Sequence, residues 1–469
     1  MLRILCSTLI TCASLLCTLL NAEEAGGTLS DRSEMVIRLA TDSKLAPIYV
    51  APLYLENAGL DGLYLNELEA IVKFDLNFNG KTQLVQHSEE RRRQASTEKF
   101  DGYYDRAAWH GMNVLYVAKL QIIDKKLSAS IFSVSDYNIK SITDLALTGD
   151  MSLDRRRIHQ LMDSLHRAFF DEKGISNTRM LYSVRIKKEI RDSTKWVSEI
   201  WECDYDGGNA RQITNEGGVC VTPSYLPPKP GFASGGFFYV SYRMGQPKIF
   251  VSSLKEGVGR RFSFLRGNQL MPVVSRQRDQ VAFICDVGGN PDVFLLKYNA
   301  QKGMGVGKPR QIFTALRGTQ ATPTFSPDGH RIAFVSNKDG APRIYAMEIP
   351  DEGMKLENVR TVLITKQNRE NTSPAWSPDG MKLAYSSMTG GTRQIWIYDF
   401  STNEEIQITH GDGHKENPTW APNSLHIAFN AGDENTSELY LVNLNQPEAV
   451  KISSGSGEKR FPCWEPRVE

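Results

Sequence analysis

The chain has 469 residues, of which 41% are hydrophobic and 23% are charged, and its formal net charge is +1. This length predicts more than one domain. The balanced charge excludes a protein that binds nucleic acid through a strongly basic surface, or an anionic membrane through a polybasic segment. The arginine triplets at residues 91–93 and 155–157 lie among acidic and polar neighbours, and we expect both to be solvated surfaces.

The first 22 residues have the pattern of a secretory signal peptide. Arg3 supplies a positive charge, residues 4–20 form a largely apolar run, and Ala22 offers a small residue at the cleavage point. No later segment is long and apolar enough to span a bilayer. We therefore expect residues 1–22 to be removed and the mature chain to be exported without a membrane span.

Residues 23–177 are predicted to form a small α/β domain. Its first part, residues 23–33, is polar and contains glycine, and we expect it to be flexible. Hydrophobic periodicity predicts a helix at residues 63–77 and strands at residues 35–39, 47–53, 113–123 and 127–135, the last two paired.

The clearest helix of the chain is predicted at residues 152–173. Its apolar residues recur at helical spacing and form one stripe. Ser152 or Asp154 can cap its start, and Gly174 suits its end.

Residues 178–469 contain a repeat. Six segments align on a proline, at intervals of 44 to 51 residues. After each proline come a short first strand, a turn, a second strand with a small residue, another turn and two further strands, and two copies keep the turn Ser-Pro-Asp-Gly. Four antiparallel strands per repeat, arranged radially, predict a β-propeller. The prolines are Pro223, Pro272, Pro323, Pro374, Pro418 and Pro462, and the alanines of the second strand are Ala282, Ala333, Ala384 and Ala428.

The sixth repeat stops after its first strand, at residues 461–466. Its three missing strands can come from residues 179–186, 197–205 and 210–214, which precede the first complete repeat. A blade assembled from both ends of the chain would close the ring and remove free sheet edges. The predicted fold is therefore mixed: a small N-terminal α/β domain followed by an all-β six-bladed propeller, closed by N- and C-terminal strands in one blade.

Four cysteines follow the predicted signal peptide. Export permits disulfides, and four cysteines allow three complete pairings, among which the sequence does not choose. Wide spacing in a large domain favours free buried thiols. They are Cys203, Cys220, Cys285 and Cys463.

No catalytic pattern emerges from the sequence. It contains no Gly-x-Ser-x-Gly, His-Glu-x-x-His, phosphate-loop or Cys-x-x-Cys motif. His410 and His414 lie beside Asp412 and Glu416, which are residue types that bind metals, but a solvated glycine-rich loop is the favoured interpretation. We predict no enzyme, no cofactor and no metal site.

The loops that lead into each first strand should converge at one end of the ring. They are polar, mixed in charge and rich in amides, which suits recognition of a protein or polar ligand at the mouth of the channel. The alternative is a set of ordinary solvated turns. The candidate rim residues are Asn268, Gln269, Thr319, Gln320, Ala321, Glu370, Asn371, Thr372, His414, Lys415, Glu416, Asn417, Lys459 and Arg460.

The string SPAWSPDGMKLAYSS, residues 373–387, resembles the signature of TolB-type propellers. Three N-terminal segments resemble the N-terminal domain of that family in order and position: EMVIRLATDSKLAPIYVAPL, NELEAIVKFDLNFNGKTQLV and RRIHQLMDSLHRAFFDEKGISNTRMLYSVRI. The string SEIWECDYDGGNARQIT resembles the family's entry into the propeller. Together these stretches extend the resemblance over nearly the whole mature chain.

The resemblance implies a monomeric, non-enzymatic periplasmic scaffold of the Tol-Pal system, which supports outer-membrane integrity and envelope constriction during division. It implies that the lipoprotein Pal binds at the propeller mouth, on the rim residues above. It also implies that TolA binds the mature N-terminus, and a flexible segment there could couple the two partners. The alternative function is a periplasmic propeller that binds or cleaves a polysaccharide. The implied TolA segment lies within residues 23–39 and includes Glu23, Glu34, Met35, Val36, Ile37, Arg38 and Leu39.

Overall fold

The computed structural model describes residues 44–190, 193–229, 235–433 and 435–467. The predicted signal peptide, its cleavage point at Ala22 and the predicted TolA segment lie outside these residues. Within them, no helix combines the length and the apolar character needed to cross a membrane.

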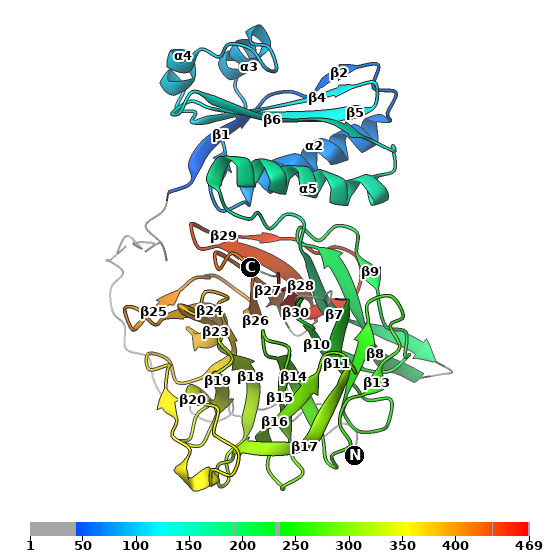
Figure 1. Cartoon of the computed structure of the whole chain (residues 1–469), viewed down its shortest axis with the longest axis vertical. Helices are drawn as coiled ribbons and strands as arrows, with labels where there is room; N and C mark the ends of the chain where they lie inside the picture. The colour runs from blue at the N-terminus through cyan, green and yellow to red at the C-terminus, as the bar shows by residue number, and fades with distance from the viewer. Residues whose placement is uncertain (1–43, 191–192, 230–234, 434, 468–469) are drawn as a thin grey trace, which may run out of the picture. The chain divides into compact units, whose positions relative to one another are not determined.

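The N-terminal region is an α/β domain built on one six-stranded sheet. The order is β3-β1-β4-β5-β6, with β2 also paired to β4. Helices α2 and α5 share a hydrophobic core with this sheet, and Figure 1 shows them together on one face, with α3 and α4 on the other. The bounds are β1 (Ala46–Val50), β2 (Tyr54–Glu56), α2 (Gly62–Asn77), β3 (Thr82–Leu84), α3 (Glu89–Thr97), α4 (Arg106–Gly111), β4 (Tyr116–Ile123), β5 (Lys126–Ser133), β6 (Asn138–Ala146) and α5 (Met151–Phe170).

The two predicted helices and the predicted strand pair are confirmed, but the predicted caps of α5 are wrong. Asp150 is the N-cap, and its side chain accepts a hydrogen bond from the backbone of Ser152. Asp154 is instead fully buried and accepts a hydrogen bond from the Tyr64 hydroxyl at 2.8 Å. The helix ends at Phe170, and its C-cap is Asp171, whose backbone is left-handed, so it stops before Gly174.

Six four-stranded antiparallel sheets follow, which confirms the predicted six-bladed propeller. The first strands are β10 (Cys220–Tyr225), β14 (Gln269–Val274), β18 (Gln320–Phe325), β22 (Asn371–Trp376), β26 (His414–Trp420) and β30 (Glu458–Trp464). The second are β11 (Gly236–Ser241), β15 (Gln280–Cys285), β19 (Arg331–Ser336), β23 (Lys382–Thr389), β27 (His426–Gly432) and β7 (Arg179–Ile190). The third are β12 (Lys248–Ser253), β16 (Asp292–Asn299), β20 (Arg343–Glu348), β24 (Thr392–Asp399), β28 (Ser437–Asn443) and β8 (Ser193–Asp204). The fourth are β13 (Arg260–Arg261), β17 (Met304–Phe313), β21 (Val362–Leu363), β25 (Glu404–Gln407), β29 (Gln446–Lys451) and β9 (Arg211–Gln212), and a 3-10 turn, η1 (Leu356–Asn358), precedes β21.

The sixth blade has the order β30-β7-β8-β9, so both ends of the chain contribute to it, as predicted. The four alanines of the second strands are fully buried in the cores between blades. All four cysteines are free, as predicted, and only Cys463 is less than fully buried. The predicted domain boundary at residue 178 falls between α5 and β7, and it stays a prediction.

A buried cluster of charges joins the α/β domain to the closing blade. His159 Nδ1 of α5 lies 2.8 Å from the Asp75 carboxylate of α2, and Nε2 lies 3.6 Å from Asp206. The Tyr205 hydroxyl donates to Asp75 at 2.6 Å. Burial by itself lowers the pKa of His159, but the carboxylates of Asp75, Asp206 and Asp204 outweigh it and raise this pKa to about 9. His159 is therefore a cation at neutral pH, although it is almost completely buried.

Two of the arginines predicted to be solvated are partly buried and make specific contacts. Arg155 belongs to the same buried cluster, because its guanidinium pairs with Asp206 and with Glu67. Arg91 donates to the backbone oxygens of Gln86 and Met112 at 2.7 and 2.9 Å. Sequence neighbours could not reveal most of these contacts, because Glu67, Asp206 and Met112 come from distant parts of the chain.

Candidate interaction surface at the propeller mouth

The mouth is the end of the propeller at which the six first strands begin. In five of these strands a polar side chain at the first or second residue points back into the protein, whereas β10 begins with the buried Cys220. The Gln269 amide donates to the Leu265 oxygen at 2.9 Å, and the Asn371 amide donates to the Asn368 oxygen at 2.7 Å. The other predicted rim residues at this position, Gln320, Lys415 and Lys459, are also buried.

The two lysines show most clearly what these side chains do. Lys415 Nζ donates to the backbone oxygens of Gly411, Asp412 and Gly413 at 2.7, 2.5 and 3.2 Å. Lys459 Nζ donates to the Gly455 oxygen at 2.5 Å and lies 3.2 Å from Glu438. Burial lowers the pKa of Lys415. These side chains therefore shape the rim loops from inside, and the exposed atoms of the rim belong to other residues.

A β-bulge follows in every first strand. The residue before each repeat proline has a positive φ, and the register with the second strand shifts by one residue at the same place, as between Ala321 and Thr324. Sequence reasoning missed this feature because the residue type varies from blade to blade. The six residues are Thr222, Met271, Thr322, Ser373, Asn417 and Phe461, with φ between 42° and 56°.

The bulges of neighbouring blades touch. The Thr322 backbone N–H lies 3.1 Å from Met271 Sδ, and the Ser373 hydroxyl donates to Asn417 Oδ1 at 3.0 Å. A left-handed backbone is strained for a β-branched residue such as Thr322. Each first strand is the end strand of its sheet and contacts the first strands of the neighbouring blades, so the strained positions belong to the innermost layer.

Arg393, at the start of β24, organises four predicted rim residues. Its guanidinium lies 3.4 Å from the Glu416 carboxylate and 3.8 Å from that of Glu370, and it donates to the Thr372 hydroxyl at 3.4 Å. Its backbone N–H donates to His414 Nδ1 at 3.1 Å. Sequence reasoning missed Arg393 because it lies in a third strand, away from the loops that the repeat singles out.

The remaining rim loops are held by the turns between second and third strands. Asp286 accepts hydrogen bonds from the backbone and the amide of Asn268 at 2.6 and 2.7 Å. Asn337 accepts one from the Thr319 backbone at 2.6 Å. Two large apolar side chains, Phe264 and Leu316, stand 81% and 92% exposed in the same loops. The mouth therefore offers an ordered polar surface with exposed apolar side chains beside it, and the predicted residues on it are Asn268, Thr319, Ala321, Glu370, Thr372, His414, Glu416, Asn417 and Arg460.

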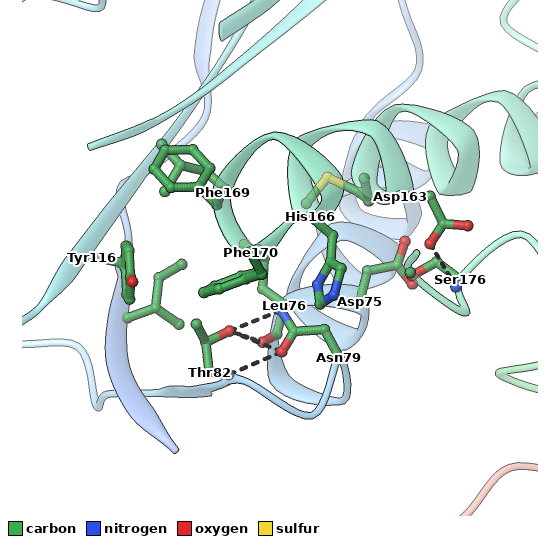
Figure 2. Close-up of a pocket in the computed structure, with 14 residues that line it drawn as sticks. Asp75, Leu76, Asn79, Thr82, Tyr116, Asp163, His166, Phe169, Phe170 and Ser176 are labelled. Atoms are coloured by element: carbon green, nitrogen blue, oxygen red, sulfur yellow. Dashed lines mark hydrogen bonds between the residues drawn. The ribbon is translucent and has the colours of Figure 1, made fainter. Parts of the chain in front are cut away.

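The α/β domain contains a small pocket between α2, α5 and the sheet (Figure 2). Its polar groups serve the fold: the Thr82 hydroxyl donates to the Leu76 oxygen at 2.5 Å, and Asp163 accepts from the Ser176 backbone at 2.8 Å. Burial lowers the pKa of His166, which keeps this side chain neutral at pH 7. Few of its polar groups are left for a ligand, so we place the candidate site at the mouth.

In the part of the chain that the structure describes, no group of three His, Cys, Asp or Glu side chains could hold a metal ion. His414 already accepts a hydrogen bond, and His410 Nδ1 lies 3.1 Å from the Gln407 amide. Fold and surface together define the class: a six-bladed propeller joined to an α/β domain, whose candidate site suits a large partner.

Comparison with known proteins narrows this class. The family model described as "TolB beta propeller domain" matches residues 167–468. A protein named "Protein TolB homolog" from Protochlamydia amoebophila is 49% identical over 82% of each chain, and one from Chlamydia abortus is 42% identical over 58% of this chain and 61% of that one. A crystal structure of TolB from Acinetobacter baumannii covers 91% of this chain and 98% of its own, with a TM-score of 0.69 at 18% identity, and it shows the same fold. The chain belongs to the TolB family.

Proposed function

We propose that this protein is a non-enzymatic periplasmic scaffold of a Tol-Pal system, which binds Pal at the propeller mouth and TolA through its mature N-terminus. Membership of the TolB family supports the role in general. The ordered rim is the observation that supports the mouth as the Pal site. Arg393 holds Glu370, Thr372 and Glu416 in place without a partner. A surface ordered in advance loses less conformational entropy on binding.

The proposed site can be tested by one bulky substitution placed at either end of the same blade. Thr372 is a rim residue of β22, and Thr402 lies in the exposed turn between β24 and β25. We expect Thr372→Arg to weaken the affinity for Pal of the same organism by about tenfold or more, because the added side chain fills the mouth. Thr402→Arg should leave it nearly unchanged. Titration calorimetry measures both, and equal binding by both variants would refute the mouth as the Pal site.

We also propose that residues 1–22 are a cleaved signal peptide, and that residues 23–39 bind TolA and couple it to Pal. An extended segment can join a partner as an added strand or fold on binding, and a change in its order can transmit the effect of one partner to the other. Removal of residues 23–39 should abolish TolA binding and change the Pal affinity. If both affinities stayed the same, the coupling would be refuted. Retention of a polysaccharide instead of Pal by the full chain would support the alternative function.

A further inference from the structure

The closing blade carries a hairpin that extends beyond its neighbours. Strands β7 and β8 have 12 residues each, and they pair without interruption from Arg179 and Asp204 to Ile190 and Ser193. The second strands of the other blades have only six to eight residues. In Figure 1 the ends of β7 and β8 project from the edge of the propeller.

The inner edge of this extension has no neighbouring strand among the described residues. The inner strand β30 pairs with β7 only as far as Glu458 and Arg185. The ladder ends there: Gly457, the residue before Glu458, has a φ of +87° and lies close to Ile186, since a Cβ atom on it would be 2.6 Å from the Ile186 side chain. The backbone groups between Ile186 and Glu189 that do not bond to β8 have no strand partner on this edge among the described residues, and they lie in line with β30 at the mouth end.

One face of the extension presents a tryptophan between two cations. Trp196 lies directly opposite Lys187 in the register, and it is 43% exposed. The guanidinium carbon of Arg185 lies 4.3 Å from its ring centroid, and Lys187 Nζ lies 5.0 Å from it. A half-exposed tryptophan with ordered cations is typical of a binding anchor.

The other face places like charges opposite each other. Lys188 and Lys195 are direct partners in the register, and both are exposed. Like charges in this arrangement destabilise a strand pair. The one carboxylate in the described part of the extension is Glu189. An acidic partner would relieve this repulsion.

Lysines also protect free strand edges from aggregation. Protection from aggregation does not explain the exposed Trp196. It does not explain the extra length of the hairpin either, because a two-stranded ribbon without neighbours is only marginally stable in water. We propose that the edge of β7 from Ile186 to Glu189 binds an acidic, extended segment of another protein as an added strand. The partner's carboxylates would pair with Lys188 and Lys195, and its apolar side chains would lie against Trp196. This proposal is independent of whether the rim binds Pal.

The test uses the full chain and a fluorescent peptide of about ten residues in which Glu and Val alternate, a length and pattern that suit strand addition. Fluorescence anisotropy should show binding of this peptide, and no binding when Lys replaces Glu. The variant K188E/K195E should weaken binding by about tenfold or more, because it opposes like charges. The control K302E/K308E changes the net charge equally on the exposed β16–β17 hairpin, at the opposite end of its blade, and should have little effect.

A second measurement separates strand addition from attraction of charges. The bound peptide should slow hydrogen exchange of those amides between Ile186 and Glu189 that face the free edge, because added backbone hydrogen bonds protect them. Binding without such protection would overturn the proposal, as would equal weakening by both double variants. Binding of phosphatidylglycerol vesicles through the same lysines, with no binding of the acidic peptide, would also overturn it and assign the hairpin to a lipid surface.

Discussion

The two ends of the strand pair β7–β8 hold charges in opposite ways. At one end Asp204 lies in the buried cluster, where His159 is paired with Asp75 and Arg155 with Asp206. At the other end Lys188 and Lys195 face each other in water. A buried charge is tolerated only with a partner, whereas an exposed charge is screened by solvent and stays available to a ligand. The same two strands therefore stabilise the fold at one end and, we propose, bind a partner at the other.

The largest effect is expected from breaking the buried pair. Asp75→Ala leaves the His159 cation and the Tyr205 hydroxyl buried without this partner. The free energy of unfolding should fall by about 3–5 kcal/mol, as found when one member of a buried pair is removed. Urea unfolding followed by circular dichroism measures the loss.

The matched control for that variant lies on the same helix. Lys73 and Glu69 form an ion pair of 2.7 Å one turn apart, but both side chains are partly exposed. Lys73→Ala should lower the free energy of unfolding by less than about 1 kcal/mol. Equal losses in the two variants would contradict a buried, energetically important cluster.

The stability that the buried cluster contributes should also depend on pH. The pKa of His159 is raised to about 9 in the folded protein, against 6.5 for an ordinary histidine. Its contribution to stability is therefore fully present below pH 6.5 and is lost as the pH rises through 9, with a slope of up to about 1.4 kcal/mol per pH unit. In urea unfolding between pH 6 and 9.5, His159→Gln should show a weaker decline than the wild type. Parallel curves would show that His159 does not carry the effect.

A smaller effect is expected inside the mouth. Lys415→Met leaves three loop oxygens without their donor, and we expect the free energy of unfolding to fall by about 1–3 kcal/mol. Hydrogen exchange in the loop at residues 411–413 should accelerate. Lys451 is half exposed and lies 3.6 Å from Glu438, so Lys451→Met should be nearly neutral. A neutral Lys415→Met would mean that the loop does not depend on its anchor.

The smallest expected effect is a gain in stability at the β-bulge of β18. Thr322 has a φ of 42°, and its hydroxyl is buried without a hydrogen-bond partner among the described residues. Asn tolerates a left-handed backbone and occupies the corresponding position at Asn417. Thr322→Asn should raise the stability by about 0.5–1 kcal/mol, seen as a higher Tm. Thr324→Asn should instead lower it, because the Thr324 hydroxyl accepts a hydrogen bond from the Trp376 backbone.

The elements that depend on local chemistry could be predicted from the sequence. The Ser-Pro-Asp-Gly turn forms as its residues require: Asp328 accepts from the His330 backbone at 3.0 Å, and Gly329 has a φ of +75°. Repetition of that unit predicted the blades, and the truncated sixth copy predicted the split blade. The period of the strands and the period of the repeat are both visible without knowing any long-range contact.

Which polar residues are structural depends on contacts between distant parts of the chain. Asp75 and His159 are 84 positions apart and meet because α2 packs beside α5. Arg393 reaches the rim from the third strand of its blade, and five predicted rim side chains turned out to be internal anchors. Charge and amide side chains look alike in a sequence whether they are solvated or buried. Their roles depend on partners that the fold brings from distant strands, and local pattern carries no record of them.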